Sequence, residues 1–173
     1  IELGVKIMTA AKKELGDAYV RQGSDDIMVK MTDAGRLGRK NGKGWYDYPE
    51  GAKKHLSPAL GEMFPRAAEQ PDVEAVKERL LYRQLIECAR CFEEGVLETP
   101  EDGDIGAIFG WGFAPYTGGP FSHMDTVGIA NVVATLDRLA AAHGPRFAPT
   151  QQLRDMAASG STFYKAASMK AAA

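Results

Sequence analysis

Hydrophobic residues recur at helical spacing along most of this chain. In the first stretch they are separated by steps of three or four, which places them on one helix face: Ile1, Val5, Met8, Ala11 and Leu15. Gly16 follows directly and is expected to end this helix, because glycine accepts the backbone conformation of a helix terminus at low cost. A second helix is predicted to begin with Ser24 or Asp25 as its cap and to end at Gly35, with inward residues Ile27, Met28 and Met31.

The longest predicted helix runs from about 71 to 92. Asp72 is expected to cap it and Gly95 to stop it. Its predicted apolar stripe is Val73, Val76, Leu80, Leu85, Cys88, Ala89 and Phe92. The following helix is predicted to start with Thr99 as its cap and Pro100 in its first turn, with Asp102 three residues after the cap.

The rest of the chain continues the helical pattern. The segment WGFAPYTGGP at 111–120 predicts an irregular connection, because Gly and Pro interrupt regular structure. Two more helices are predicted near 125–142 and 151–158. Since no stretch alternates apolar and polar residues with the period of a strand, the sequence predicts an all-α fold.

The helical pattern also indicates an internal repeat. An offset of 128 residues pairs the first helix and Gly16 with a later set: Ile129, Val133, Leu136, Leu139 and Gly144. An offset of 125 aligns the second helix with residues 153–160, and each copy then reaches an aromatic pair, Trp45-Tyr46 or Phe163-Tyr164. Only the second copy has helix and loop before it, at 78–128. We therefore expect one whole helical unit preceded by the back half of another; the alternative is chance similarity between two amphipathic helix pairs.

The stretch GRLGRKNGKGWYDY at 35–48 has the glycines and cations of a phosphate-binding loop. A P-loop requires G-x-x-x-x-G-K-[ST], but Gly38 and Gly42 are one residue too close, and Gly44 stands at the Ser/Thr position. A dinucleotide fingerprint would require glycine at position 47, which is Asp, and a preceding strand. The favoured interpretation is a turn-rich end of a helical unit, pinned to the core by Trp45, Tyr46 and Tyr48. An anion site formed by the Lys/Arg cluster of 36–54, suited to coenzyme A phosphates, is the alternative to a solvated turn.

Other candidate chemistry is sparse. Cys88 and Cys91 form C-x-x-C within a helical stripe, without the further ligands that a zinc site needs, so two half-buried helix cysteines are expected. The three histidines are scattered, and His143 matches a helix-end position of the repeat. The acidic run ETPEDGD at 98–104 is interpreted as a solvated helix start, which suits the positive end of a helix dipole. The residues therefore assign no catalytic, cofactor-binding or metal-binding side chain to this chain.

Composition narrows the function classes. The chain has 173 residues, 45% of them hydrophobic, which suffices for one domain or two small ones. A net charge of -2 gives no domain-scale basic excess for nucleic acid, and no apolar run reaches the ~20 residues of a membrane span. Two cysteines favour a reducing compartment. The start at Ile1, without an initiator Met, suggests a fragment or a processed end.

Two segments resemble a known family. GRLGRKNGKGWYDY closely resembles the end of the C-terminal domain of 3-hydroxyacyl-CoA dehydrogenases. The segment from Glu78 to Gly128, with ERLLYRQLIECARCFEEGVLETPEDGDIGAIFGWGFAPYTGGPFSHMDTVG, resembles the second such domain in multifunctional fatty-acid β-oxidation enzymes. The resemblance covers nearly the whole chain except about 52–70 and the last few residues. It implies helical domains of the 6-phosphogluconate-dehydrogenase C-terminal type, in tandem, with the first copy truncated here.

The resemblance also implies where the chemistry lies. In the family an NAD-binding Rossmann domain carries the His–Glu catalytic pair and the cofactor, and none of these motifs occurs in this chain. A supporting Asn opens the first helical domain in an N-R motif. The equivalent pair in the second unit is Glu78-Arg79, and an ionised carboxylate cannot donate the hydrogen bond of an amide. The second unit is therefore expected to be a degenerate copy kept for packing, and the isolated chain to be inactive.

These considerations divide the chain into four expected parts. Residues 1–50 would be the back half of the first helical domain, 51–71 a linker, 72–165 the second helical domain and 166–173 a tail. The expected partners are the rest of the same polypeptide, with its NAD domain and a hydratase domain, acyl-CoA substrate, a further copy in a homo-oligomer and a thiolase subunit, in a bacterial cytoplasm. A stand-alone helical interaction module and an acyl-CoA-binding module without catalysis are the alternatives.

Overall fold

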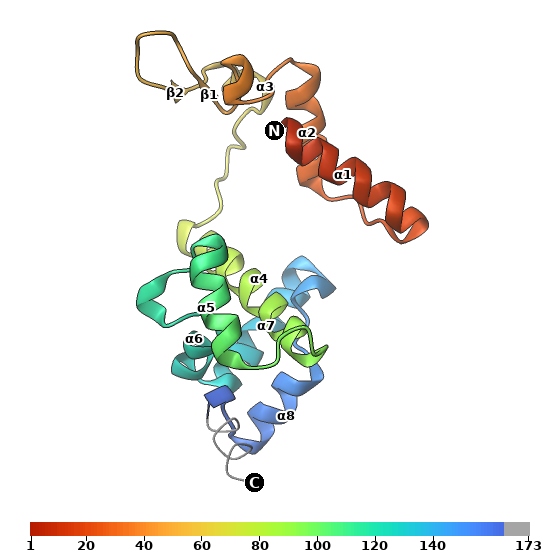
Figure 1. The fold of residues 1–173 in the computed structure, drawn as a ribbon, viewed down its shortest axis with the longest axis vertical. Coiled ribbons are helices and arrows are strands. Elements are labelled where there is room, and N and C mark those ends of the chain that lie inside the picture. The colour runs from red at the N-terminus through yellow and green to blue at the C-terminus, as the bar shows by residue number, and fades with distance from the viewer. Residues whose placement is uncertain (165–173) are drawn as a thin grey trace. The chain divides into compact units, whose positions relative to one another are not determined.

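The computed structural model describes residues 1–164, and these form two compact units (Figure 1). The first unit comprises Ile1–Gln70, and the second begins at Pro71. Helices dominate both units, and the regular strands among the described residues are two strands of two residues each. The all-α prediction is therefore confirmed, with a minimal hairpin added. None of the helices within residues 1–164 combines the length and the apolar content that a bilayer crossing needs.

The first unit is built on a pair of packed helices, α1 (Glu2–Leu15) and α2 (Gly23–Asp33). As predicted, Gly16 ends α1, with a positive φ of 52°. The two helices approach closely where Gly4 faces Met28, because a β-carbon on Gly4 would overlap the Met28 methyl group. The pair buries little, however: Met31 is its one fully buried large side chain, and Leu15 and Ile27, predicted to face inward, are exposed.

The predicted cap of α2 was wrong by two to three residues. The helix begins at Gly23, with Gln22 in the cap position. Asp25 instead lies in the first turn, and its carboxylate accepts a 2.9 Å hydrogen bond from the backbone N–H of Gln22. Asp25 and Gln22 form a capping box, in which the side chain of each accepts a hydrogen bond from the backbone N–H of the other. Asp25 therefore does belong to the start of the helix, although it is not the cap. At the other end Gly35 follows the helix with a φ of 68°, close to the predicted position.

A compact loop system completes the first unit. It contains a 3-10 turn at Arg39–Asn41, strand β1 (Tyr46–Asp47), strand β2 (His55–Leu56) and the short helix α3 (Ala59–Met63). The two strands pair antiparallel, with Tyr46 opposite Leu56. Period-two alternation did not reveal them, because each strand is too short to show it.

Within residues 71–164 the second unit is a bundle of five α-helices: α4 (Val73–Glu93), α5 (Pro100–Trp111), α6 (Pro120–Val127), α7 (Ile129–His143) and α8 (Gln151–Ser159). The predicted caps Asp72 and Thr99 are confirmed, since each side chain accepts a hydrogen bond from a first-turn N–H. Thr150 caps α8 in the same way. The helix predicted near 125–142 is in fact two helices, because Gly128 breaks it with a φ of 90°.

The core of the second unit lies where α4, α6 and α7 meet, with α8 and the ends of the connections packed on it. Three aromatic rings form its centre: Phe92, Phe121 and Phe163, with centroids 4.8–5.8 Å apart in edge-to-face arrangements. On α4 the predicted Leu85, Cys88 and Ala89 are buried. Val73 and Leu80 are exposed, contrary to prediction, while Tyr82 and Ile86 are buried instead.

In this unit, acidic side chains accept hydrogen bonds from backbone N–H groups of segments that are distant in the sequence. The Asp125 carboxylate accepts hydrogen bonds from the N–H groups of Phe163 (3.0 Å) and Tyr164 (3.2 Å). Glu93, at the end of α4, accepts one from the N–H of Gln152 in the first turn of α8, at 2.7 Å. Because the first N–H groups of a helix have no partner within it, such contacts fix how the helices join.

Candidate functional site

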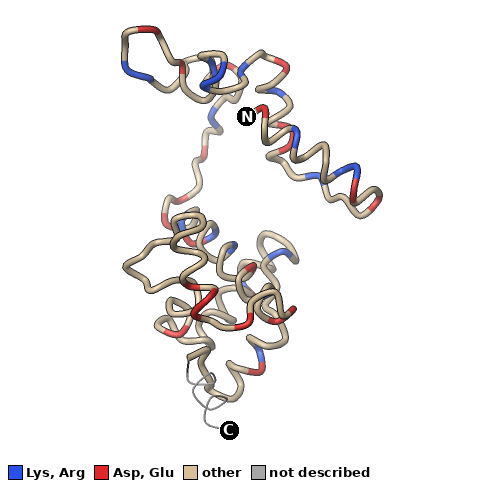
Figure 2. The backbone as a smooth tube through the Cα atoms, in the orientation of Figure 1, with Lys and Arg blue, Asp and Glu red and all other residues tan. Residues whose placement is uncertain are grey.

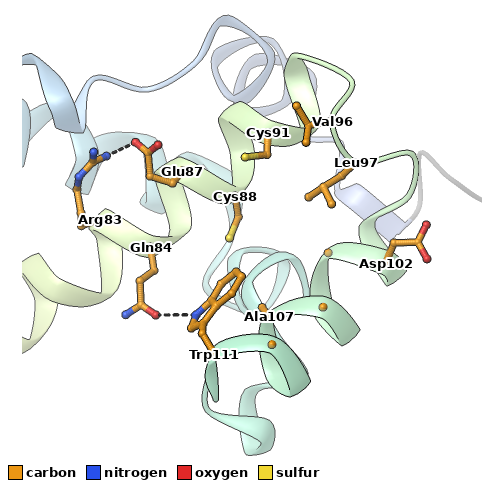
Figure 3. A pocket seen from close by; sticks show the side chains of 13 residues that line it. Arg83, Gln84, Glu87, Cys88, Cys91, Val96, Leu97, Asp102, Ala107 and Trp111 are labelled. Atoms are coloured by element: carbon orange, nitrogen blue, oxygen red, sulfur yellow. Dashed lines mark hydrogen bonds and ion pairs between the residues drawn. The ribbon is translucent and has the colours of Figure 1, made fainter. Parts of the chain in front are cut away.

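The second unit contains a pocket of about 770 Å³ between α4 and α5 (Figure 3). Its walls are mainly apolar, and its wall on α5 is made largely of glycine and alanine. The residues that carry its chemistry are Arg83, Gln84, Glu87, Cys88, Cys91 and Trp111. Figure 3 shows the Trp111 ring across the pocket from α4, where its indole N–H donates a 3.2 Å hydrogen bond to Gln84 Oε1. The pocket is therefore suited to apolar groups, and it has few polar side chains that could orient a ligand.

The charged residues at the pocket rim are already engaged. Glu87 forms ion pairs with Arg83 and with Arg90, the second at 2.6 Å. Both arginines also donate to the carbonyl oxygen of Arg146, at 3.2 Å and 3.0 Å. This arrangement ties α4 to the connection between α7 and α8. Because Glu87 and the Arg146 carbonyl engage both arginines, the positive charge of this rim is used within the unit.

The two pocket cysteines lie on one helix as predicted, although one of them is more buried than predicted. Cys88 is buried and Cys91 is half-buried, both on α4 and both as free thiols. Burial raises the pKa of Cys88 to about 12, so its reactive thiolate form is scarce near neutral pH. Within residues 1–164 no group of three or more potential metal-ligating side chains comes together. The cysteines therefore contribute packing to this wall.

A second pocket, of about 710 Å³, lies beside the first half of α4 and includes Glu78, Tyr82 and Tyr116. Glu78 is the residue that the resemblance places where the family has an Asn. Both of its carboxylate oxygens accept from one guanidinium nitrogen of Arg138 on α7, at 2.7 Å each. Glu78 thus joins two helices.

Asp104 is the most elaborately bonded acid of the second unit, and sequence reasoning missed it. It was included in a run interpreted as solvated, yet it is 3% exposed. Its carboxylate accepts from the N–H of Phe121 (2.7 Å), the N–H of Ser122 (3.1 Å), the Ser122 hydroxyl (2.6 Å) and the Tyr164 hydroxyl (2.6 Å). Four donors satisfy this buried charge at the start of α6, which defines a structural centre.

Gly119 makes the approach of Asp104 to α6 feasible. Its φ is 113°, and a β-carbon at this position would lie 2.5 Å from the Asp104 carboxyl group. The sequence signal for this centre was the Gly-Gly-Pro at 118–120, because glycine directly before a helix-starting proline indicates a close approach. Burial is the larger cause, and the hydrogen bond to Asp104 the second, that together raise the pKa of Tyr164 to about 12.

In the first unit, the loop at 36–48 is organised around Arg36 and binds its own backbone. Arg36 is 8% exposed; its Nε donates to the carbonyl oxygen of Gly44 at 2.9 Å, and its guanidinium forms an ion pair with Asp47. This ion pair holds the pKa of Asp47 below its usual value. Lys40 forms a 3.0 Å ion pair with Glu2. Two cations of the proposed anion site are therefore used internally, which favours the structural interpretation of the loop.

Of the three aromatic anchors predicted for this loop, Trp45 and Tyr46 are exposed within the described unit, whereas Tyr48 is half-buried. Trp45 is 38% and Tyr46 is 40% exposed. The Trp45 ring is tilted against that of Phe64, at a centroid distance of 6.4 Å, and the Lys54 ammonium lies over the Tyr46 ring, 4.9 Å from its centroid. The prediction failed because the buried guanidinium of Arg36 closes this loop.

Lys and Arg are interspersed with Asp and Glu along both units, as Figure 2 shows.

The histidines do not converge. His55 is in β2, His123 in α6 and His143 at the last residue of α7. His143 occupies the predicted helix end, with its ring 6.1 Å from that of Phe147. The three histidines therefore lie on three separate elements of the two units.

The fold and these sites define a helical domain protein in which buried polar groups join helices. Comparison with known proteins places it in a family context. The 3-hydroxyacyl-CoA dehydrogenase C-terminal domain family matches residues 1–48. Over 95% of its length the chain is similar to the fatty acid oxidation complex subunit alpha of Shewanella amazonensis (42% identity over 176 residues), Shewanella frigidimarina (43% over 170) and Shewanella loihica (44% over 170).

These matches confirm the resemblance drawn from the sequence. The chain is similar to fatty acid oxidation complex alpha subunits, and its first 48 residues match the C-terminal domain family of 3-hydroxyacyl-CoA dehydrogenases. The chain spans only 23% of the length of these relatives.

Proposed function

We propose that this chain is a helical, non-catalytic part of an NAD-dependent 3-hydroxyacyl-CoA dehydrogenase within a multifunctional β-oxidation polypeptide. The parent would oxidise 3-hydroxyacyl-CoA to 3-ketoacyl-CoA, with NAD bound by a Rossmann domain outside these residues. The observation that carries the proposal is the similarity to fatty acid oxidation complex alpha subunits over 95% of the chain. The parts of this chain would supply packing, closure of the acyl-CoA cleft and subunit contacts.

The bonding of the polar residues supports a structural role. Glu78, at the position of the family's supporting Asn, is held by Arg138, and the buried Asp104 is satisfied by four donors. A catalytic acid or base must be able to form a hydrogen bond with the substrate, whereas the carboxylates of these two residues are hydrogen-bonded to groups of other elements of the unit. No residue of this chain is therefore assigned a catalytic, cofactor-binding or metal-binding role in the proposal.

The proposal includes a tandem arrangement. Residues 1–50 would be the back half of one helical domain, joined by 51–71 to a whole second domain at 72–165, with a tail at 166–173. Supporting it, α1 and α2 follow each other as α7 and α8 do, each pair in mutual contact and each followed by a glycine at positive φ, Gly35 or Gly160. In the second pair the apolar face is covered by α4 and α6, whereas α1 has no fully buried residue. The missing cover of α1 would belong to the front half of its domain.

A direct test is the oxidation of NADH with acetoacetyl-CoA by the purified chain and by the full-length polypeptide that carries it. We expect turnover only in the full-length polypeptide. An acyl-CoA-binding module is the second candidate; calorimetric titration of the chain with coenzyme A would then show at least micromolar affinity that weakens with salt. The internal bonding of Arg36 and Lys40 argues against it.

A further inference from the structure

We propose that the outer face of α5, with the pocket between α4 and α5, is the docking surface for an apolar helix from the remaining part of the same polypeptide. The inference deepens the proposed function and rests on it, because it needs a longer parent chain.

The first observation is that α5 is apolar on every side from Ile105 to its end, after an acidic first turn. Ala107 is buried in this part of the helix, but Ile105, Phe109 and Trp111 are 59%, 86% and 58% exposed. A helix that is hydrophobic all round is normally buried on all sides. Val96, at the pocket edge before α5, is also exposed and extends this apolar surface. Clustered exposed apolar groups of this size mark an interaction site.

The second observation concerns the glycines of α5 that line the pocket. Gly103 is explained within the unit, since a β-carbon there would overlap the ring of Phe121. Gly106 and Gly110 have open space where a β-carbon would stand. Glycine within a helix is less stable than alanine, and nothing among the described residues requires it at these two positions. Their absent side chains leave the backbone of α5 accessible to a close neighbour.

The shape and charge of the pocket indicate what that neighbour is. Gly103, Gly106 and Gly110 are three and four residues apart and share one face, which leaves a groove of the kind that a ridge of another helix fills. The charged lining residues are already engaged, because Arg83 and Glu87 pair with each other and Asp102 accepts a 2.7 Å hydrogen bond from the Thr99 hydroxyl. The occupant of the groove is therefore an apolar helix surface.

The length of the relatives indicates where that helix comes from. The chain accounts for 23% of their length, so most of such a polypeptide lies outside these residues. A segment of the same polypeptide is present at a high effective concentration, whereas a second copy must be recruited from solution. The same polypeptide is thus the favoured source of the occupant.

The test compares thiol labelling of the 173-residue chain with that of the full-length polypeptide. Both carry Cys91→Ala; the other native thiol of the chain, Cys88, is buried. The probe is Phe109→Cys, with Ile105→Cys as a second probe, and the control is Ala141→Cys at an exposed position of α7. Any further cysteines of the full-length protein are counted in a variant without a probe. We expect labelling of both α5 probes to slow at least about tenfold in the full-length protein, with the control unchanged.

Three results would overturn the inference. One is equal labelling of the α5 probes in both proteins. Another is protection in the 173-residue chain that grows with its concentration, which would make a second copy the occupant. The third is failure of Gly106→Leu, which fills the groove, to restore fast labelling in the full-length protein. NADH oxidation by the full-length protein is measured on the same samples: a competent dehydrogenase with exposed α5 refutes the docking alone, and a protected α5 without dehydrogenase turnover refutes the proposed function alone.

Discussion

The hydroxyl of Tyr164 donates a 2.6 Å hydrogen bond to the carboxylate of Asp104, which lies 60 residues earlier in the chain. The same carboxylate receives the first N–H groups of α6. One buried charge therefore joins α5, the start of α6 and the segment after α8. This centre, rather than a reactive group, is the main polar feature of the second unit.

Replacing Asp104 should destabilise the chain strongly. Both carboxylate oxygens of Asp104 accept hydrogen bonds. In Asp104→Asn an amide NH2 group replaces one of these oxygens and meets N–H or O–H donors, so buried hydrogen bonds are lost and donors face each other. We expect a loss of about 2–4 kcal/mol in the free energy of unfolding, measured by urea denaturation. Glu101→Gln, an exposed acid of the same helix, is the matched control and should change stability by less than about 0.5 kcal/mol. Equal, small effects of both variants would show that the Asp104 centre does not hold the unit together.

Stability should fall in alkaline solution. The pKa of Tyr164 is raised from 10.0 to about 12, and that of Cys88 from 9.0 to about 12, so folding favours the neutral forms. Their contribution is complete below the unfolded pKa values and is lost as pH rises toward 12. For Tyr164, which is partly solvated, we expect on the order of 1–2 kcal/mol. Urea unfolding between pH 8 and 11.5 measures the slope, and Tyr164→Phe should make it shallower; an unchanged slope would contradict this assignment.

Glu78 should behave as half of a surface ion pair. Its partner Arg138 has a side chain that is 59% exposed, so we expect Glu78→Ala to cost about 0.2–1 kcal/mol, with a similar coupling in a double-mutant cycle with Arg138→Ala. Asp137 and Arg154, a comparably exposed pair, provide the matched control cycle. In the full-length polypeptide, Glu78→Ala should leave kcat/KM for dehydrogenation unchanged. A large fall in kcat/KM without loss of stability would instead assign Glu78 a role in the reaction.

Two glycines of α5 should respond to alanine in opposite directions. Gly106 has open space and a helical backbone, so Gly106→Ala should stabilise the 173-residue chain by about 0.5–1 kcal/mol. Gly103 faces Phe121, so Gly103→Ala should destabilise it by about 1–3 kcal/mol. Thermal and urea unfolding of both variants provides the comparison. A shared sign would mean that local packing does not explain where α5 requires glycine.

Local signals in the sequence predicted the helices well. Asp72 and Thr99 cap their helices, and Gly16 ends the first one, because these residues act on backbone groups within one turn. Burial was harder to predict, because the helical period of α4 shows which residues share a face but not which part of the helix other elements cover. Val73 and Leu80 fit the stripe but remain exposed.

The sites depended on contacts between distant residues and could not be predicted in the same way. Asp104 looked like one acid in a solvated run, and only its approach to Gly119 and Tyr164 shows that it is buried. The loop at 36–48 was predicted to be held by aromatic side chains, yet Arg36 closes it through Gly44 and Asp47. In both cases the decisive partner is set by tertiary folding, which residue spacing does not encode. The family resemblance, in contrast, depended on local motifs and was confirmed.

In the proposed function, these residues support a dehydrogenase without performing its chemistry. The most direct measurement is NADH oxidation with acetoacetyl-CoA, using the purified 173-residue chain and the full-length polypeptide at equal molar concentration. We predict turnover by the full-length polypeptide and none above the enzyme-free background by the chain. Turnover by the chain well above background, or none by a folded full-length polypeptide, would contradict the claim.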